Sequence, residues 1–338
     1  MTQDVVFQLP RDTHEYDENE RTLAEALRVH KARAHAAVSE SAWDDGSVDD
    51  PKCPSCEQRL VPRSVPRGKP DSWDDLVYRC DVCGIGFSNA TARRDRRRIV
   101  RSPEMNVPEG VRDGLTDVLG RAANVRNRPS KRWKFCSEKS EDAVTWTVVR
   151  TLTTEHALGR LLPPQLASAD EMEPAVLLWG VPVSGPGAEE LRVELEHISD
   201  RIGERPASRS EPDVIVAWRD VLAIVEAKLT SKNDSKPATY SGWSLYHSEK
   251  YFRAAPGPVA GTGLYELVRN WRIGCELAGR RRFVLVNLSP IALDADADKL
   301  RAVIREDARH SLVTRVWVDV LADASQELVT FARSRGAA

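Results

Sequence analysis

The chain has 338 residues, of which 41% are hydrophobic and 30% are charged, and its formal net charge is −2. The hydrophobic content excludes a wholly disordered chain, and the length favours one large domain with a smaller one. The balance of acids and bases excludes a protein that attracts nucleic acid through its overall charge. Any attraction to phosphate must therefore be local.

The N-terminal part of the chain is expected to form a helical arm over residues 1–48. The stretch 18–39 is rich in Ala, Glu, Arg and Leu and contains no Gly or Pro, a composition that favours a helix. The first residues lack the basic and apolar segments of a signal peptide, and no apolar run is long enough for a membrane span. We therefore expect a cytoplasmic protein without membrane contact.

Residues 49–90 contain four cysteines in two Cys-x-x-Cys pairs. Each pair can direct two thiolates at one ion, and two pairs complete the tetrahedron of a structural zinc site. The turns resemble the knuckles of zinc-ribbon proteins, whereas the alternative is four unrelated buried cysteines. The predicted zinc ligands are Cys53, Cys56, Cys80 and Cys83.

Residues 91–135 contain two arginine- and lysine-rich stretches and are expected to form a basic linker with a helix over 108–125. The second stretch includes Asn127, Pro129 and Ser130, which favours a linker without regular structure. A cation that neutralises a phosphate releases counterions and strengthens binding, although such a stretch is often only a solvated surface. The predicted nucleic-acid contacts here are Arg93, Arg94, Arg96, Arg97, Arg98, Arg128, Lys131 and Arg132.

Residues 136–338 alternate between helix-like and strand-like segments, which predicts one mixed α/β domain. Ser140 is placed to cap a helix that runs to about Leu152, with Val144 and Val148 on its apolar stripe. Residues 264–278 are expected to form another helix. The segments expected to be strands are 175–179, 213–218, 221–229, 282–288 and 313–321.

The strands 213–218 and 221–229 are expected to form a hairpin with a two-residue turn. In that register Ile215 faces Ile224, and Asp213 faces Glu226. Lys228 would share their face, since side chains alternate along a strand. A longer loop or a bulge is an alternative, and a slip of one residue would put the two carboxylates on opposite faces.

Two carboxylates directly opposed on a sheet repel unless a positive charge lies between them. Lys228 and a divalent cation would supply that charge. Mg²⁺ is held by one or two carboxylates, keeps several waters and contacts substrate phosphate, so the pattern suits phosphodiester hydrolysis. The alternative is an ion pair between Glu226 and Lys228 on an exposed strand, with Asp213 as a turn residue.

Pro212-Asp213 followed by Glu226-Ala227-Lys228 resembles the signature of the PD-(D/E)xK nuclease superfamily. The resemblance implies a restriction-endonuclease-like fold, with a mixed central sheet flanked by helices. It also implies the order helix with Glu, strand, strand with Asp, strand with Glu-x-Lys, helix, strand.

The resemblance further implies a catalytic Mg²⁺ held by Asp213 and Glu226, with Lys228 as the catalytic lysine. A glutamate on the earlier helix often completes this metal site, and Glu141 is the candidate, ahead of Glu138 and Asp142. On the later helix Asn270 and Arg269 could meet the phosphate backbone.

The expected function is therefore that of a magnesium-dependent nuclease, with DNA favoured over RNA as its substrate. By analogy with the family it would be an endonuclease of a restriction or defence system, either as a homodimer or with a partner of that system. The alternatives are a catalytically inactive nucleic-acid-binding module on the same fold and a subunit that recruits a partner. No Ser-His-Asp arrangement and no phosphate-cradling glycine-rich loop is present.

Overall fold

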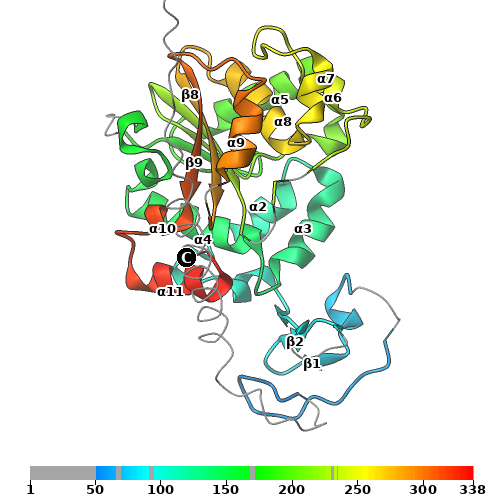
Figure 1. Cartoon of the computed structure of the whole chain (residues 1–338). Coiled ribbons are helices and arrows are strands. Elements are labelled where there is room, and N and C mark those ends of the chain that lie inside the picture. The colour runs from blue at the N-terminus through cyan, green and yellow to red at the C-terminus, as the bar shows by residue number, and fades with distance from the viewer. Residues whose placement is uncertain are drawn as a thin grey trace, which may run out of the picture. The chain divides into compact units, whose positions relative to one another are not determined.

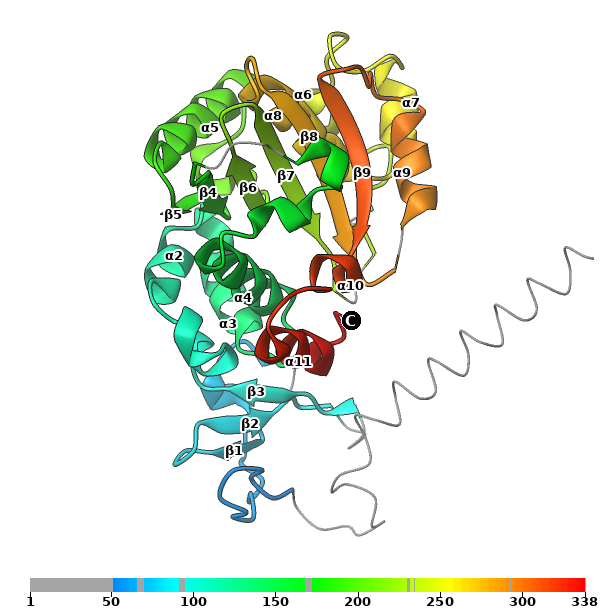
Figure 2. The ribbon, with the colours of Figure 1, turned by 90° about the vertical axis from the view of Figure 1, so that its left-hand side faces the viewer.

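Six strands form a mixed sheet with helices packed against it (Figure 1), and their order is β5-β4-β6-β7-β8-β9, which can be followed by the labels in Figure 2. The pairs β5–β4, β4–β6 and β6–β7 are antiparallel, whereas the pairs β7–β8 and β8–β9 are parallel. Parallel neighbours need a crossover, and helices lie between them in the sequence. The strands are β4 (Ala175–Leu178), β5 (Val181–Ser184), β6 (Val214–Ala217), β7 (Val221–Ala227), β8 (Arg282–Ser289) and β9 (His310–Val316).

The computed structural model describes residues 51–65, 70–90, 95–167, 172–229, 232–233, 235–291 and 293–337. The predicted N-terminal arm, residues 1–48, lies outside these described residues, as do Arg93 and Arg94. The α-helices of the described residues are α2 (Leu115–Arg121), α3 (Arg128–Phe135), α4 (Glu141–Thr154), α5 (Ala188–Ile202), α6 (Trp243–Tyr246), α7 (Pro256–Gly261), α8 (Tyr265–Leu277), α9 (Asp294–Arg301), α10 (Trp317–Val320) and α11 (Gln326–Arg335).

Two hydrophobic cores lie on the two faces of the sheet, because successive side chains of a strand point to opposite faces. Ile215 and Ile224 pack with helices α5 to α9 on one face. Val216 and Val225 pack with α2, α3, α4, α10 and α11 on the other. Figure 2 shows the sheet between these two layers. The prediction of a mixed α/β domain with a central sheet flanked by helices is confirmed.

Helix α4 begins where the sequence predicts, because the Ser140 side chain accepts a hydrogen bond from the N–H of Ala143. Val144, Val148 and Leu152 form its buried stripe. This cap fixes the first turn of the helix, which carries Glu141, against the sheet.

A separate three-stranded antiparallel sheet has the order β1 (Tyr78–Cys80), β2 (Ile85–Phe87), β3 (Arg98–Val100). Its first strand ends at Cys80 and Cys83 lies in the turn that follows, whereas Cys53 and Cys56 precede the sheet. Its third strand comes from the segment expected to be a linker. Further along that segment, Val107, Val111 and Phe135 are buried in the core of the large sheet. Residues 95–135 are thus folded parts of the molecule and not an extended connection.

Helix α3 contradicts the expectation that the second basic stretch has no regular structure. Pro129 is compatible with a helix here because it lies in the first turn, where a missing N–H leaves no hydrogen bond unmade. The helix expected over 108–125 is shorter than predicted, and α2 starts after Gly114, whose φ is 77°. Glycine adopts this left-handed conformation without steric penalty.

The last predicted strand is only partly correct. Strand β9 ends at Val316, and the chain then forms α10. Trp317 is buried at this change of structure, and its indole N–H donates to the carbonyl oxygen of Lys228 over 2.9 Å.

Helix α5 was not expected from the sequence. None of the described helices combines the length and apolar character needed to cross a membrane.

Helix α8 lies so close to β8 that Gly274 leaves no room for a side chain. A Cβ atom at this position would lie 2.0 Å from Cζ of Phe283. We predict that Gly274→Ala lowers the free energy of unfolding by about 1–3 kcal/mol, measured by urea denaturation. Gly120→Ala is the matched control, because a Cβ added at that helical glycine would meet no atom within 4 Å. It should be neutral or stabilising, and equal effects of both changes would contradict the packing argument.

Candidate functional site

The β6–β7 hairpin has the register that the sequence predicts. Ala217 pairs with Leu222 and Ile215 with Ile224, and the N–H of Trp218 donates to the carbonyl of Val221 over 2.8 Å. No residue is inserted, so the alternative of a slipped register is wrong. Continuing this register by one residue beyond Val214 and Val225 sets Asp213 opposite Glu226.

Pro212 explains why the ladder stops at Val214. Residue pairs that exchange hydrogen bonds alternate along an antiparallel ladder, so the pair after Val214–Val225 would be Pro212–Ala227. Proline has no N–H to donate. Instead, the N–H of Ala227 donates to Oδ2 of Asp213 over 2.9 Å. The Asp213 side chain thus continues the pairing of β7 and is held beside its end.

Glu141 accepts the next backbone N–H on the side of β7 that faces β6. Its Oε2 accepts the N–H of Leu229 at 2.5 Å. The intervening N–H of Lys228 points the other way and donates to Leu288 over 2.7 Å. Two carboxylates from separate elements, Asp213 and Glu141, therefore line one edge of the segment that carries Glu226 and Lys228.

Lys228 lies at the centre of a buried ionic network. Its Nζ is 2.6 Å from Oε1 of Glu226 and 2.8 Å from Oε2 of Glu266. The other oxygen of Glu226 accepts from Nδ2 of Asn270 over 2.7 Å. The side chains of Lys228 and Glu226 are 7% and 3% exposed, and β7 is buried throughout. An ion pair is present, but the alternative that places it on an exposed strand is wrong.

Burial and like charge set the protonation of these groups. Burial raises the pKa of Asp213 to about 7 and that of Glu226 to about 8, with Asp213 adding to the effect on Glu226. Burial alone would lower the pKa of Lys228, but Glu226 and Asp213 outweigh it and raise that pKa. Burial acts to raise the pKa of Glu266, yet Lys228 lowers it to about 2. Lys228 is therefore charged at neutral pH, while the two central carboxylates hold protons readily.

A second buried ionic cluster borders the first. Nζ of Lys131 lies 3.3 Å from Asp142 and 3.6 Å from Glu211, and 4.5 Å above the ring of Trp179. The prediction that Lys131 contacts nucleic acid therefore does not hold, because α3 turns this residue inward. Asp142 is engaged by Lys131.

The remaining predicted site residues lie in different surroundings. Glu138 pairs with Arg98, 3.8 Å away in the small sheet. Glu141 is thus the predicted helix carboxylate that reaches the end of β7. Nε of Arg269 lies 3.3 Å from Oδ1 of Asn270, and Asn270 is completely buried, which excludes direct contact of Asn270 with phosphate in this conformation.

The arginines predicted to bind nucleic acid differ in how freely they can reach it. Arg128 donates to the carbonyls of Ala122 and Arg121 at the end of α2, so its guanidinium caps a helix. Arg96 lies 4.5 Å above the ring of Tyr78. Arg97 and Arg132 are exposed. The role of the exposed residues stays a prediction.

The four cysteines form a cluster in which all Sγ atoms lie within 4.8 Å of one another. The Sγ atoms of Cys56 and Cys80 are 3.7 Å apart. Zn–S bonds of about 2.3 Å in a tetrahedron place sulfurs roughly 3.8 Å apart, so the cluster is compatible with structural zinc. In the part of the chain that the structure describes, no set of three carboxylates meets the same 4.8 Å limit.

Sequence reasoning missed the second carboxylate partner of Lys228, Glu266, and the role of Asn270. The two residues are four positions apart on α8, so they share a face. A polar pair at this spacing within a buried helix is a signal that could have been recognised. The Lys131 cluster has no such local pattern, because its members come from three separate segments.

Comparisons with protein-family models, with curated proteins and with solved structures each found no match. The site offers hard oxygen donors on one edge of β7, one ammonium fixed by two carboxylates, and a buried surrounding in which electrostatic interactions are strong.

Loss of one cysteine of the cluster should abolish tight zinc binding. We predict that native mass spectrometry finds one zinc per wild-type chain and none retained by Cys56→Ala after dialysis against EDTA, since three thiolates leave the tetrahedron incomplete. Cys275→Ala is the control, because this buried cysteine lies outside the cluster. Equal zinc content in both variants would contradict the assignment.

The buried Lys131 cluster should contribute strongly to stability. Lys131→Met leaves Asp142 and Glu211 without their buried partner and should lower the free energy of unfolding by about 3 kcal/mol. Arg132→Met, an exposed position on the same helix, should change it by less than about 0.5 kcal/mol. Urea denaturation of both variants measures the difference, and similar values would show that the cluster does not stabilise the fold.

Proposed function

We propose that this chain is a magnesium-dependent nuclease of the PD-(D/E)xK type that hydrolyses phosphodiester bonds. The observation that carries the proposal is the β6–β7 register, which sets Asp213 opposite Glu226 with Lys228 bonded to the latter. A purely structural ion pair between Glu226 and Lys228 would not require a third charged side chain, Asp213, opposite Glu226. Here Asp213 is held in place by a backbone N–H of the same strand end.

The order of elements supports the proposal. Helix α4 carries Glu141, β4 follows, Asp213 directly precedes β6, Glu226 and Lys228 end β7, and α8 and β8 come next. This is the order that the resemblance implies, with β5 and α5 inserted after β4 and with α6 and α7 inserted after β7. The elements bring side chains distant in the sequence to one end of the sheet.

The donor set fits Mg²⁺. Magnesium prefers carboxylate oxygens and is usually held by one or two of them together with waters, a demand that Asp213 and Glu226 can meet. Glu141 lies on the same edge of β7 and would complete the set. When bound, the ion would supply a Lewis acid for the phosphate and lower the pKa of a bound water.

Lys228 would stabilise negative charge on the phosphate. An ammonium has three donors, and Glu226 and Glu266 accept two of them, which leaves the third for a phosphate oxygen. Glu266 and Asn270 would act as positioning residues, because they fix Lys228 and Glu226 without reaching the substrate. A preorganised cation in a buried site stabilises developing charge at little reorganisation cost.

The cysteine unit would hold nucleic acid beside this centre. It would bind structural zinc and offer exposed arginines such as Arg97 to the phosphate backbone. DNA as the substrate, a restriction or defence role, and a homodimer for double-strand cleavage follow from the family resemblance and form part of the proposal.

One observation favours a second candidate, a catalytically inactive nucleic-acid-binding module. Both oxygens of Glu226 are already engaged, and among the described residues Glu141, Asp213 and Glu226 do not form a group whose carboxylate oxygens all lie within 4.8 Å of one another. In such a module the ionic network would only stabilise the end of β7. The two candidates differ in whether the protein cuts DNA.

The deciding experiment is cleavage of plasmid DNA with MgCl₂, against an EDTA control. We predict cleavage by the wild-type chain and a loss of more than about 100-fold in Glu226→Gln, which removes a charge while keeping the side-chain shape. Glu249→Gln is the matched control, because that glutamate is exposed. Cleavage by Glu226→Gln at the wild-type rate would refute the proposal, and DNA binding without cleavage by the wild type would favour the inactive module.

A further inference from the structure

Five arginines gather at one end of the strands of the large sheet, and Glu226 lies at the other end. They line a cavity of about 650 Å³ together with the turn residue Asp220 and with Glu194. They come from the β6–β7 turn, from the turn between α8 and β8 with the first residue of β8, and from the loop before β9. These residues, called here the arginine surface, are Arg219, Arg280, Arg281, Arg282 and Arg309.

The arginine surface is distinct from the proposed catalytic centre. Val221 pairs with Arg282 and Glu226 pairs with Asn287 on the same two strands. Five residues at about 3.3 Å per residue put the two ends roughly 17 Å apart. No residue belongs to both groups.

Positive charge at this surface exceeds negative charge. Its cavity is lined by five arginines and by two carboxylates, Glu194 and Asp220. Arg282 and Asp220 are 3.5 Å apart, and both are more than a third exposed, so their pairing is weak. Arg280 and Arg309 are exposed to solvent. A large part of the positive charge is therefore available to an anion.

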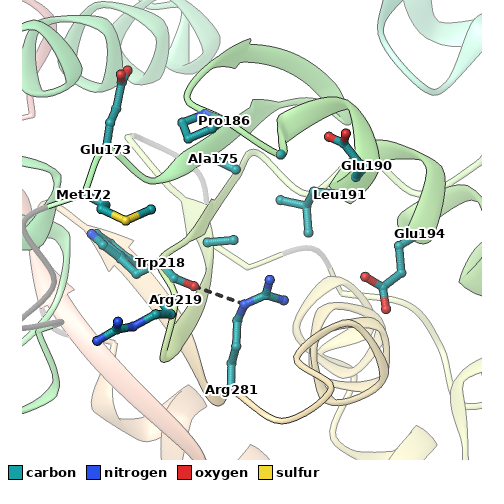
Figure 3. Close-up of a pocket in the computed structure, with 12 residues that line it drawn as sticks. Met172, Glu173, Ala175, Pro186, Glu190, Leu191, Glu194, Trp218, Arg219 and Arg281 are labelled. Atoms are coloured by element: carbon teal, nitrogen blue, oxygen red, sulfur yellow. Dashed lines mark hydrogen bonds between the residues drawn. The ribbon is translucent and has the colours of Figure 1, made fainter.

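Two of the guanidinium groups, those of Arg281 and Arg309, are held in fixed directions. Nε of Arg281 donates to the carbonyl of Trp218 over 3.0 Å, as Figure 3 shows. Nη2 of Arg309 donates to the carbonyl of Gly279. Each guanidinium has five N–H donors, so these single contacts leave others for a ligand. A fixed planar guanidinium loses less entropy when it binds phosphate than a free one.

Acidic residues bound the surface on one side. A neighbouring cavity of about 310 Å³ shares Arg219, Arg281 and Glu194 with it and is also lined by Glu190 and Glu173. Figure 3 shows Glu190 and Glu194 projecting from α5. A polyanion would be repelled from this side and directed toward the turns before β8 and β9.

We propose that the arginine surface binds the phosphodiester backbone of double-stranded DNA, at a position separate from the catalytic centre. The choice of DNA rests on the proposed function. Duplex DNA carries one negative charge per about 1.7 Å of its axis, so cations from three loops can contact several phosphates at once. A single small anion would not require five guanidinium groups across an open cavity. Such a contact would hold the duplex without reading its sequence.

The salt dependence of DNA binding tests this surface directly. Binding of a fluorescent duplex to the full chain is measured by anisotropy in EDTA at several NaCl concentrations, so no cleavage is needed. We expect Arg280→Ala/Arg309→Ala to reduce the slope of log K against log salt by about 1 to 2, since each lost phosphate contact removes about 0.9. Arg280→Lys/Arg309→Lys keeps the charge and should retain most of the slope.

The control is Arg112→Ala/Arg333→Ala, which removes the same charge from exposed positions outside the cavity. An equal loss in control and test variants, or no DNA binding by the wild type in EDTA, would overturn the proposal. If the double variant unfolds, Arg280→Ala alone gives the same comparison at an exposed residue. Failure here with normal magnesium-dependent cleavage would remove only this surface, whereas failure of cleavage with the predicted slopes would remove only the nuclease.

Discussion

The structure at the end of β7 depends on how the negative charges of two facing carboxylates, those of Asp213 and Glu226, are compensated. Burial raises the pKa of Asp213 and of Glu226, and the charge of Asp213 raises the pKa of Glu226 further, so a nearby cation is needed to favour their charged forms. Lys228 supplies that cation, and Glu266 and Asn270 hold it and Glu226 in place. Both helical layers contribute to this end of the sheet, since α4 supplies Glu141 and α8 supplies Glu266 and Asn270. An arrangement with such high electrostatic cost is typical of a site that binds a charged ligand.

The parts of the fold that the sequence predicted are those determined by local patterns. The two-residue turn at Arg219-Asp220 sets the β6–β7 register, and a slip by one residue would move Ile215 and Ile224 out of their own core and into the core on the other face of the sheet. Ser140 specifies the start of α4 through its own hydrogen bond. The parts that were missed depend on tertiary packing. Whether Lys131 faces solvent or the core depends on how α3 packs. Lys131 and its exposed neighbour Arg132 are both basic residues of the same stretch, so the sequence alone does not show which of them is buried.

The molecule places its two candidate metal-binding groups in separate small and large sheets. Cys53, Leu60, Cys80 and Phe87 form a core too small to stabilise a fold by burial alone, so a metal held by the thiolates would take over that role. The large sheet has two full hydrophobic cores and can tolerate an ionic network at one end of its strands. Its opposite end carries the arginine surface. A nuclease built in this way would hold DNA at several points and cut at one.

The most direct measurement for the central claim is a crystal structure determined after soaking with Mn²⁺, with the ion located by its anomalous signal. The proposal predicts one peak in contact with carboxylate oxygens of Asp213 and Glu226, with Glu141 beside it. Nζ of Lys228 would then either move away from Oε1 of Glu226 or share that oxygen with the ion. An ordered Lys228–Glu226–Glu266 network with no peak between the carboxylates, at a Mn²⁺ concentration far above that used for cleavage, would contradict it.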